Sequence, residues 1–167
     1  MASVSVNVHG TCLLLDAAGA AFGAPPGCGV LLIGGSGSGK SDLALRLIAA
    51  GARLVADDRT DLFVWRGRLH GKAPAGLAGL MEVRGVGIIS LPHAPKARIT
   101  LVARLDGSGE RLPEHRRYRP PAALRLVAKA APPIITLAPF EASAPAKLAA
   151  ATAAYALGLY REEVNPI

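Results

Sequence analysis

Apolar residues along the first third of the chain fall into short runs that predict strands and one helix. Alternation over residues 4–8 and a β-prone run over 11–15 predict two half-buried strands. The continuous apolar run 29–33 stops at glycine, which is typical of a buried parallel strand. The stretch 41–50 is apolar on nearly all sides, so it predicts a helix that is buried on most of its surface and ends at Gly51.

The rest of the chain continues this mixture of strands and helical segments. Further strands are expected at 53–56, 88–91, 97–104 and 134–137, with a hairpin over 62–71. Residues 77–83 fit either a short helix or an extended segment, 17–29 and 107–121 are expected to be loops (the second exposed and mobile), and the Ala-rich stretch 145–160 predicts a C-terminal helix. We therefore expect an α/β fold with a mixed β-sheet and flanking helices, formed by residues 1–167 as a single domain.

A glycine-rich run joins the apolar strand 29–33 to the helix that follows it. The run fits the pattern G-x-x-x-x-G-K-[ST] without a gap, through Gly34, Gly35, Ser36, Gly37, Ser38, Gly39, Lys40 and Ser41. In such a P-loop the backbone N–H groups surround phosphate oxygens, Lys40 reaches the β- and γ-phosphates, and Ser41 ligates Mg²⁺. The helix start adds its positive dipole end. Because the flanking elements are those that the motif requires, the sequence predicts an ATP and Mg²⁺ site rather than a Gly/Ser linker.

Acidic residues follow the predicted strand 53–56 and lie within the predicted segment 77–83. Asp57 and Asp58 end the strand 53–56, where a carboxylate can hold Mg²⁺ and a second one can accept a proton from an attacking hydroxyl. The alternative is that they cap a turn. Glu82 and Arg84 are two residues apart, so in a strand they share a face and can point into one site. An ordinary surface ion pair is the other interpretation of this second pair.

The chain is basic, with a net charge of +7. Its basic residues are mostly scattered, and the densest group, Arg116, Arg117 and Arg119, includes a single aromatic residue instead of a stacking platform. We therefore expect no nucleic-acid partner; a basic surface also attracts nucleotides and phosphoproteins. Cys12 and Cys28 form no C-x-x-C motif, and buried reduced thiols are favoured over a disulfide.

Two stretches bear on cellular location. Residues 1–10 lack a basic segment followed by an apolar one, so no secretory signal is expected. The apolar region 122–139 is interrupted by charges and prolines and cannot span a bilayer as one helix. The expectation is a cytoplasmic protein without a membrane partner.

Three motifs, taken in order, resemble the catalytic domain of HPr kinase/phosphorylase. They are the P-loop with Asp42 after it, the segment Arg53–Asp58 (RLVADD), and the segment Glu82–Ile89 (EVRGVGII). The last is the most discriminating, and it contributes Glu82, Arg84, Gly85 and Gly87. The resemblance implies a P-loop serine kinase that uses ATP and Mg²⁺ to phosphorylate the phosphocarrier protein HPr, regulates the phosphotransferase system and assembles as a hexamer.

The resemblance also implies roles for single residues. His9 matches an active-site histidine, although a lone histidine at the end of a strand is otherwise structural. Asp58 matches the base of phosphorylation, with Asp57 assisting at the metal or at the substrate hydroxyl; the sequence does not separate the two. Glu82 matches a second Mg²⁺ ligand beside Ser41. Arg111 most nearly matches a catalytic arginine of a mobile loop, and a solvated surface arginine is the equal alternative.

Two departures from the family pattern matter for function. The chain has no room for the additional N-terminal domain that family members commonly carry. Residues 137–143 contain an acid and no arginine where the family has a basic stretch tied to dephosphorylation, so the phosphorylase activity is left open. A small-molecule P-loop kinase and a nucleotide-dependent switch or binding protein are the alternative functions.

Overall fold

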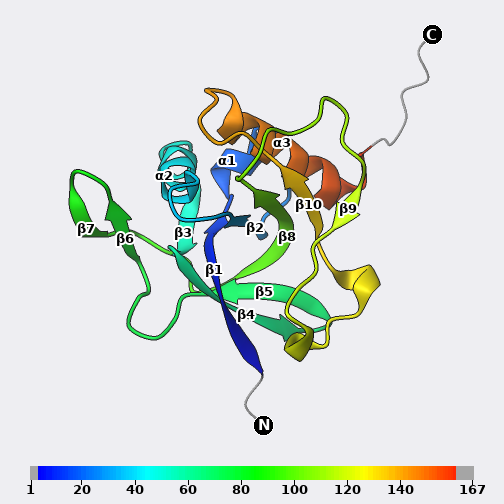
Figure 1. Cartoon of the computed structure of the whole chain (residues 1–167), viewed down its shortest axis with the longest axis horizontal. Coiled ribbons are helices and arrows are strands. Elements are labelled where there is room, and N and C mark those ends of the chain that lie inside the picture. The colour runs from blue at the N-terminus through cyan, green and yellow to red at the C-terminus, as the bar shows by residue number, and fades with distance from the viewer. Residues whose placement is uncertain (1–3, 161–167) are drawn as a thin grey trace.

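Short apolar runs of the sequence become the strands of one mixed sheet in the computed structural model, which describes residues 4–160 (Figure 1). The strands of this sheet are β1 (Ser5–Leu14), β2 (Cys28–Ile33), β3 (Arg53–Ala56), β4 (Arg59–Trp65), β5 (Arg68–Lys72), β8 (Ala97–Arg104), β9 (Arg116–Arg117) and β10 (Pro133–Thr136). A separate hairpin consists of β6 (Leu80–Val83) and β7 (Gly87–Ser90). The helices are α1 (Ala17–Ala20), α2 (Lys40–Ala49) and α3 (Ala144–Leu157), with 3₁₀ turns at Ala122–Leu124 and Ala128–Ala130.

The sheet combines parallel and antiparallel pairs. Strand β8 lies parallel to both β2 and β10, whereas β1 pairs antiparallel with β2, β3 and β4. The pairs β4–β5 and β5–β8 complete a closed cycle that runs β2, β1, β4, β5, β8 and back to β2. The expected α/β fold with a mixed sheet and a C-terminal helix is therefore confirmed.

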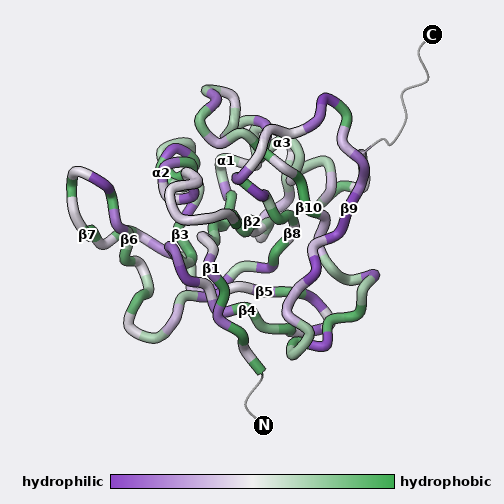
Figure 2. The backbone as a smooth tube through the Cα atoms, viewed as in Figure 1, coloured by the Kyte–Doolittle hydropathy of each residue, from purple (hydrophilic) through white to green (hydrophobic). Residues whose placement is uncertain are grey.

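Alternate residues of the central strands enter two separate apolar clusters, because successive side chains of a strand point to opposite faces. Val30 and Leu32 of β2 pack with residues of α2 and α3, while Leu31 packs with residues of β3, β4 and β5 on the other face. In Figure 2 the central strands carry the apolar colours of the core, and the chain around β9 is hydrophilic. The buried sheet thus provides a rigid base for the loops at its edges.

Several elements differ from the expectation. The two strands expected at 4–8 and 11–15 form the single strand β1, which continues through His9 and Gly10. The loops expected at 17–29 and 107–121 contain α1 and β9, because single-turn helices and two-residue strands leave no periodic pattern.

The remaining differences concern helix surfaces and ends. Helix α2 is less buried than expected, since Leu45 is exposed. The C-terminal helix ends at Leu157 instead of 160, because Gly158 adopts a left-handed conformation with φ of 66°. Segment 77–83 contains the strand β6, so the extended alternative was the correct one for Leu80–Val83.

The two cysteines are in the expected state. Cys12 and Cys28 are buried free thiols. Within residues 4–160, no helix is both long and apolar enough to cross a membrane.

Candidate functional site

The glycine-rich loop between β2 and α2 needs glycine for its conformation and for its close contacts. Gly39 has φ of 92°, and a Cβ atom there would lie 2.9 Å from Cζ of Phe140. At Gly34 a Cβ atom would lie 2.6 Å from the Ser38 hydroxyl oxygen. A residue with a side chain at Gly34 or Gly39 would be strained by the positive φ and would have to displace the side chain of Ser38 or Phe140, so the loop favours glycine at these two positions.

Lys40, the first residue of α2, lies inside this loop with only 6% of its surface exposed. Its Nζ donates hydrogen bonds to the carbonyl oxygens of Gly34 and Gly35, each at 2.9 Å. Burial lowers the pKa of this ammonium, and the nearby charges of Asp58 and Asp57 oppose that change. The positive charge is therefore held at the centre of the loop, where backbone N–H groups of the helix start are also available.

Asp57 connects three elements around the loop. Its Oδ1 accepts hydrogen bonds from the hydroxyls of Ser41 (2.8 Å) and Thr11 (3.2 Å), and its Oδ2 accepts one from the backbone N–H of Glu82 (3.3 Å). Both carboxylate oxygens thus have partners within the protein, on α2, β1 and β6. Asp57 is fixed beside Ser41, as a residue acting at the metal would be.

Asp58 lies in a different setting from its neighbour. Its backbone is left-handed, with φ of 61°, and its N–H donates to the hydroxyl of Thr11 at 3.2 Å. The Oδ1 atom of Asp58 lies 2.8 Å from Nε2 of His9, and 64% of the Asp58 side chain is exposed. The carboxylate of Asp58 therefore faces open space while His9 holds one of its oxygens.

Most of the predicted site residues line one cavity of about 420 Å³. They come from the glycine-rich loop, β1, the end of β3 and β6, and they are His9, Ser36, Gly37, Ser38, Gly39, Lys40, Ser41, Asp57, Asp58, Glu82 and Arg84. Gly34 and Gly35 support the loop from behind through their bonds to Lys40.

Besides Gly34 and Gly35, three predicted residues do not line this cavity. Gly85 and Gly87 shape the β6–β7 turn, with φ of 83° and 122°. Arg111 is exposed in the segment between β8 and β9.

Two contributors to the site are absent from the sequence-based prediction. Thr11 is fully buried and bonds to both aspartates, a role that depends on the pairing of β1 with β3. Phe140 lines the cavity although 70% of it is exposed, and its ring covers Gly39. The motif search could not find either, because neither belongs to the P-loop pattern.

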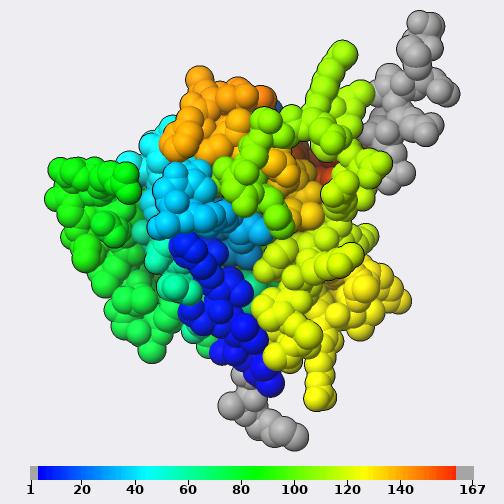
Figure 3. All heavy atoms as spheres, viewed as in Figure 1, coloured from blue at the N-terminus to red at the C-terminus, as the bar shows by residue number. Residues whose placement is uncertain are grey.

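Phe140 is held in place from α2. Arg46 pairs with Asp42 at 2.9 Å and donates hydrogen bonds to the backbone carbonyls of Pro139 and Glu141. The carboxylate of Glu141 pairs in turn with Lys147 of α3. In Figure 3 this segment, coloured orange, lies directly against the blue and cyan surface of the glycine-rich loop and α2.

The donor atoms at the cavity fit a Mg²⁺ ion that is shared with a phosphate ligand. Ser41, Asp57 and Glu82 supply hydroxyl and carboxylate oxygens, which are the ligands that Mg²⁺ prefers. Among residues 4–160 no group of three or more His, Cys, Asp or Glu side chains is arranged to hold a metal alone. Such a site is expected for Mg²⁺, which usually combines one or two carboxylates with water and substrate phosphates.

The fold and the site together define a mixed α/β protein in which a glycine-rich loop, a buried lysine and two aspartates surround one cavity. Residues 4–96, more than half of the chain, match the family model of the HPr Serine kinase C-terminal domain. The chain belongs to this family.

Curated relatives share part of this chain. It is 52% identical over 66 residues to HPr kinase/phosphorylase of Clostridium tetani, which covers 40% of this chain and 22% of that protein. It is 42% identical over 105 residues to HPr kinase/phosphorylase of Cupriavidus pinatubonensis, covering 55% and 32%. The matched parts thus span between a fifth and a third of the length of these relatives.

A solved structure covers nearly the whole chain. The Hpr(Ser) kinase/phosphatase from Coxiella burnetii superposes with a TM-score of 0.69, over 92% of this chain and 98% of that one, at 22% sequence identity. This likeness supports the fold as far as the C-terminal helix, beyond the residues that the family model matches.

Proposed function

We propose that this domain is a kinase that transfers the γ-phosphoryl group of ATP to a serine hydroxyl of the phosphocarrier protein HPr. One observation carries the proposal: the exposed carboxylate of Asp58 faces the same cavity as the glycine-rich loop and Lys40. A proton acceptor beside a phosphate-binding loop is the arrangement that phosphoryl transfer to a hydroxyl requires. Membership in the HPr Serine kinase family supports the choice of acceptor.

The loop residues bind and orient the nucleotide in this proposal. The backbone N–H groups of residues 35–41 and the ammonium of Lys40 face the phosphates, and Lys40 exchanges its bonds to the Gly34 and Gly35 carbonyls for bonds to phosphate oxygens. Ser41, Asp57 and Glu82 hold Mg²⁺, which supplies neutralisation of the phosphate charge when bound. Arg84 adds a cation at the same cavity.

Asp58 acts as the base and His9 as its positioning partner. The carboxylate accepts the proton of the serine hydroxyl, and the bond of 2.8 Å to His9 fixes the carboxylate orientation. Arg111 remains the predicted arginine of a loop that approaches the transferred phosphoryl group. Arg111 is exposed in the segment before β9.

Membership in the family supports a proposal for the wider setting of the domain. We propose a single catalytic domain over residues 1–167 that works in the cytoplasm, assembles as a homo-hexamer, serves the phosphotransferase system, and has no nucleic-acid or membrane partner. The apolar residues Val86 and Ile88 of the β6–β7 hairpin are strongly exposed, which suits burial against another protein.

The test is phosphorylation of purified HPr by the purified chain with labelled ATP and Mg²⁺, with the modified residue located by mass spectrometry. We expect phosphoserine on HPr, lost with Lys40→Ala together with ATP binding measured by calorimetry. Lys129→Ala, at an exposed lysine away from the cavity, is the matched control and should leave both unchanged. Transfer of the label to a small metabolite and not to HPr would favour the alternative of a small-molecule kinase. Undiminished ATP binding by Lys40→Ala would refute the assignment of the glycine-rich loop as the phosphate-binding site.

A further inference from the structure

A second cavity, of about 480 Å³, lies apart from the proposed catalytic site and shares no lining residue with it. It is formed by β5, β8, the chain at β9, the segment before β10 and the C-terminal part of α3. In Figure 1 β9, β10 and the end of α3 lie on the side of the molecule away from the β6–β7 hairpin, and β5 and β8 run through its middle. All of its lining residues except Arg68 and Leu69 follow residue 96, where the match to the family model ends.

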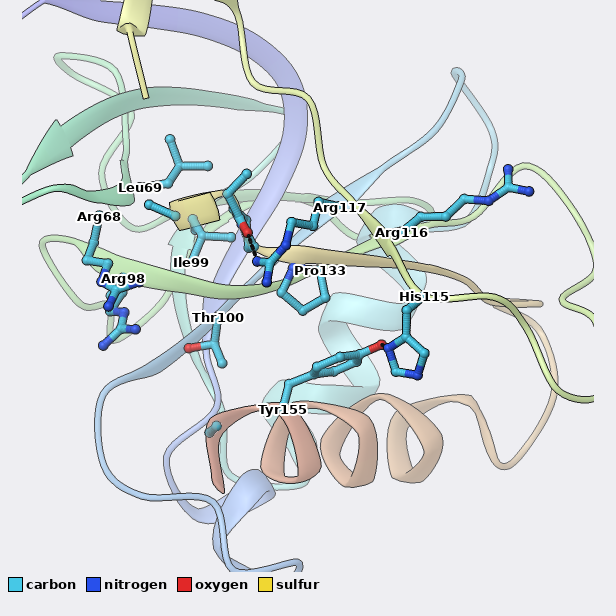
Figure 4. A pocket seen from close by; sticks show the side chains of 14 residues that line it. Arg68, Leu69, Arg98, Ile99, Thr100, His115, Arg116, Arg117, Pro133 and Tyr155 are labelled. Atoms are coloured by element: carbon cyan, nitrogen blue, oxygen red, sulfur yellow. Dashed lines mark hydrogen bonds between the residues drawn. The ribbon is translucent and has the colours of Figure 1, made fainter. Parts of the chain in front are cut away.

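The lining of this cavity is strongly cationic. It includes Arg68, Arg98, Arg116, Arg117 and His115, and no carboxylate lines it within the described part of the chain. Figure 4 shows Arg68 and Arg98 on one side, Arg117 above the centre and His115 with Tyr155 on the other side, whereas Arg116 points away. Only Arg116 of these arginines has an ion pair among residues 4–160, with Glu114 at 3.6 Å.

Two of the side chains around the cavity are held in place by hydrogen bonds. The guanidinium of Arg117 donates to the carbonyl of Ala131 at 2.7 Å, which leaves its remaining N–H groups for another acceptor. His115 is hydrogen-bonded to the hydroxyl of Tyr155 at 3.1 Å, and the two rings pack edge to face. Arg117 and His115 are thus partly preorganised, which lowers the conformational entropy that is lost when a ligand binds.

Like charges gathered around one hollow repel one another unless an anion offsets them. Arginine forms paired hydrogen bonds with phosphate oxygens, and a volume of several hundred Å³ accommodates a small molecule. We propose that this cavity binds the phosphate group of a small phosphorylated molecule or inorganic phosphate itself. Arg68, Arg98 and Arg117 supply the contacts to the oxygens.

The test follows backbone amide shifts of the wild-type chain by NMR during titration with inorganic phosphate at low ionic strength. We expect saturable shifts at residues 98–100, 116–117 and 131, separate from any shifts at residues 36–41 of the glycine-rich loop. A second titration uses glycerol 3-phosphate, so that binding of a phosphate ester is compared with binding of inorganic phosphate. Saturable binding of either ligand at these residues supports the site, and the tighter of the two identifies the kind of ligand it takes. Shifts confined to residues 36–41 overturn the proposal, as does tighter binding of a single-stranded oligonucleotide through the same arginines.

Three variants assign the effect to the cavity. Arg98→Gln should weaken phosphate binding about tenfold or more, the loss expected for one charge-assisted hydrogen-bonding group. Arg117→Lys keeps the charge but loses the paired geometry, and should weaken binding as well. Arg119→Gln is the matched control, since it removes the same charge close by without lining the cavity. Equal binding by Arg98→Gln and Arg119→Gln would show that only net charge attracts the anion.

Discussion

Asp57 and Asp58 are adjacent in the sequence but occupy different chemical settings. Both oxygens of Asp57 accept hydrogen bonds from the protein, and one of those donors is Ser41. Asp58 is held through one oxygen by His9 and is largely exposed to the cavity. The left-handed backbone of Asp58 causes the difference, because it turns the second carboxylate away from the first.

Asp58→Asn is expected to reduce kcat about 10²-fold or more while sparing nucleotide binding, since a general base acts on the chemical step. Asp57→Asn should instead weaken the Mg²⁺ dependence of nucleotide binding. Steady-state kinetics with calorimetry of ATP binding at several Mg²⁺ concentrations measures both. The reverse pattern would exchange the two roles.

Thr11→Val should lower both stability and activity. The hydroxyl of Thr11 donates to Asp57 and accepts from the N–H of Asp58. Its loss takes that acceptor from the Asp58 N–H and leaves Oδ1 of Asp57 with Ser41 as its hydroxyl donor. We expect about 1–3 kcal/mol of lost stability in denaturant titrations. A fall in kcat should accompany it, and Thr11→Ser should restore activity.

Thr152→Val is the control for that experiment. Thr152 is equally buried, and its hydroxyl donates to the carbonyl of Leu148 within α3. Its replacement should affect stability alone. Equal losses of kcat in the two valine variants would assign Thr11 a purely structural role.

At the scale of elements, the sequence predicted those strands and helices whose apolar pattern extends over four or more positions. The strands 53–56 and 97–104 were predicted with the bounds of β3 and β8. The continuity of β1 was missed because Gly10 interrupts the alternation. The strand nevertheless stays paired along its length, with β4 before Gly10 and with β2 from Gly10 onward. Pairing between distant segments decides such cases, and a local pattern does not contain it.

The same limit applies to the site. The P-loop, the two aspartates, Glu82 and His9 were predicted, since each belongs to a local motif or to a resemblance carried by one, and the structure brings them to one cavity. Thr11 and Phe140 reach it only through strand register and through the contacts of Arg46 with the segment 139–141. Side chains that long-range packing positions leave no signal in a motif.

The hairpin of β4 and β5 should make stability depend on pH through His70. This side chain is buried against Phe63 and Trp65, and burial lowers its pKa, with a smaller contribution from Lys96 and Arg98; the hydrogen bond to the Arg68 carbonyl opposes the change. The unfolded chain therefore binds a proton near pH 6.5 that the folded chain does not.

The free energy of unfolding should consequently fall as the pH drops below about 6.5. Urea titrations between pH 7.5 and 5 measure this dependence, and His70→Phe, which cannot titrate, should show a shallower one. Equal slopes in the two proteins would remove His70 as the cause.

For the whole molecule, the site depends on chain segments far apart in the sequence. The family model matches residues 4–96, yet Phe140, which lies beyond them, covers the glycine-rich loop, and α3 packs against the central strands. The C-terminal part therefore completes the fold and the cavity, and it also provides most of the arginine-lined cavity.

The reaction should favour phosphorylation over phosphorolysis. Residues 137–143 contain no arginine, and the nearby Arg46 is already bound to Asp42 and to the carbonyls of the segment. Glu141 does not add a free negative charge there, because Lys147 pairs with it. Neither Arg46 nor Lys147 is thus free to offset the repulsion between inorganic phosphate and phosphoserine.

Pyrophosphate release from phosphorylated HPr, inorganic phosphate and Mg²⁺ measures that direction. We expect it to be much slower than the forward reaction under matched conditions. Comparable rates would show that the basic stretch of the family is dispensable for phosphorolysis.

The positive φ of Asp58 places catalysis and folding in opposition at one position. A left-handed backbone is unfavourable for residues with a side chain and neutral for glycine, so Asp58→Gly relieves strain as it removes the proposed base. A laboratory evolution experiment that rewards heat resistance alone would tend to accept this change and yield robust, inactive variants. Any effort to engineer a more stable form of this domain should hold residue 58 constant and select for the proposed kinase activity in the same round.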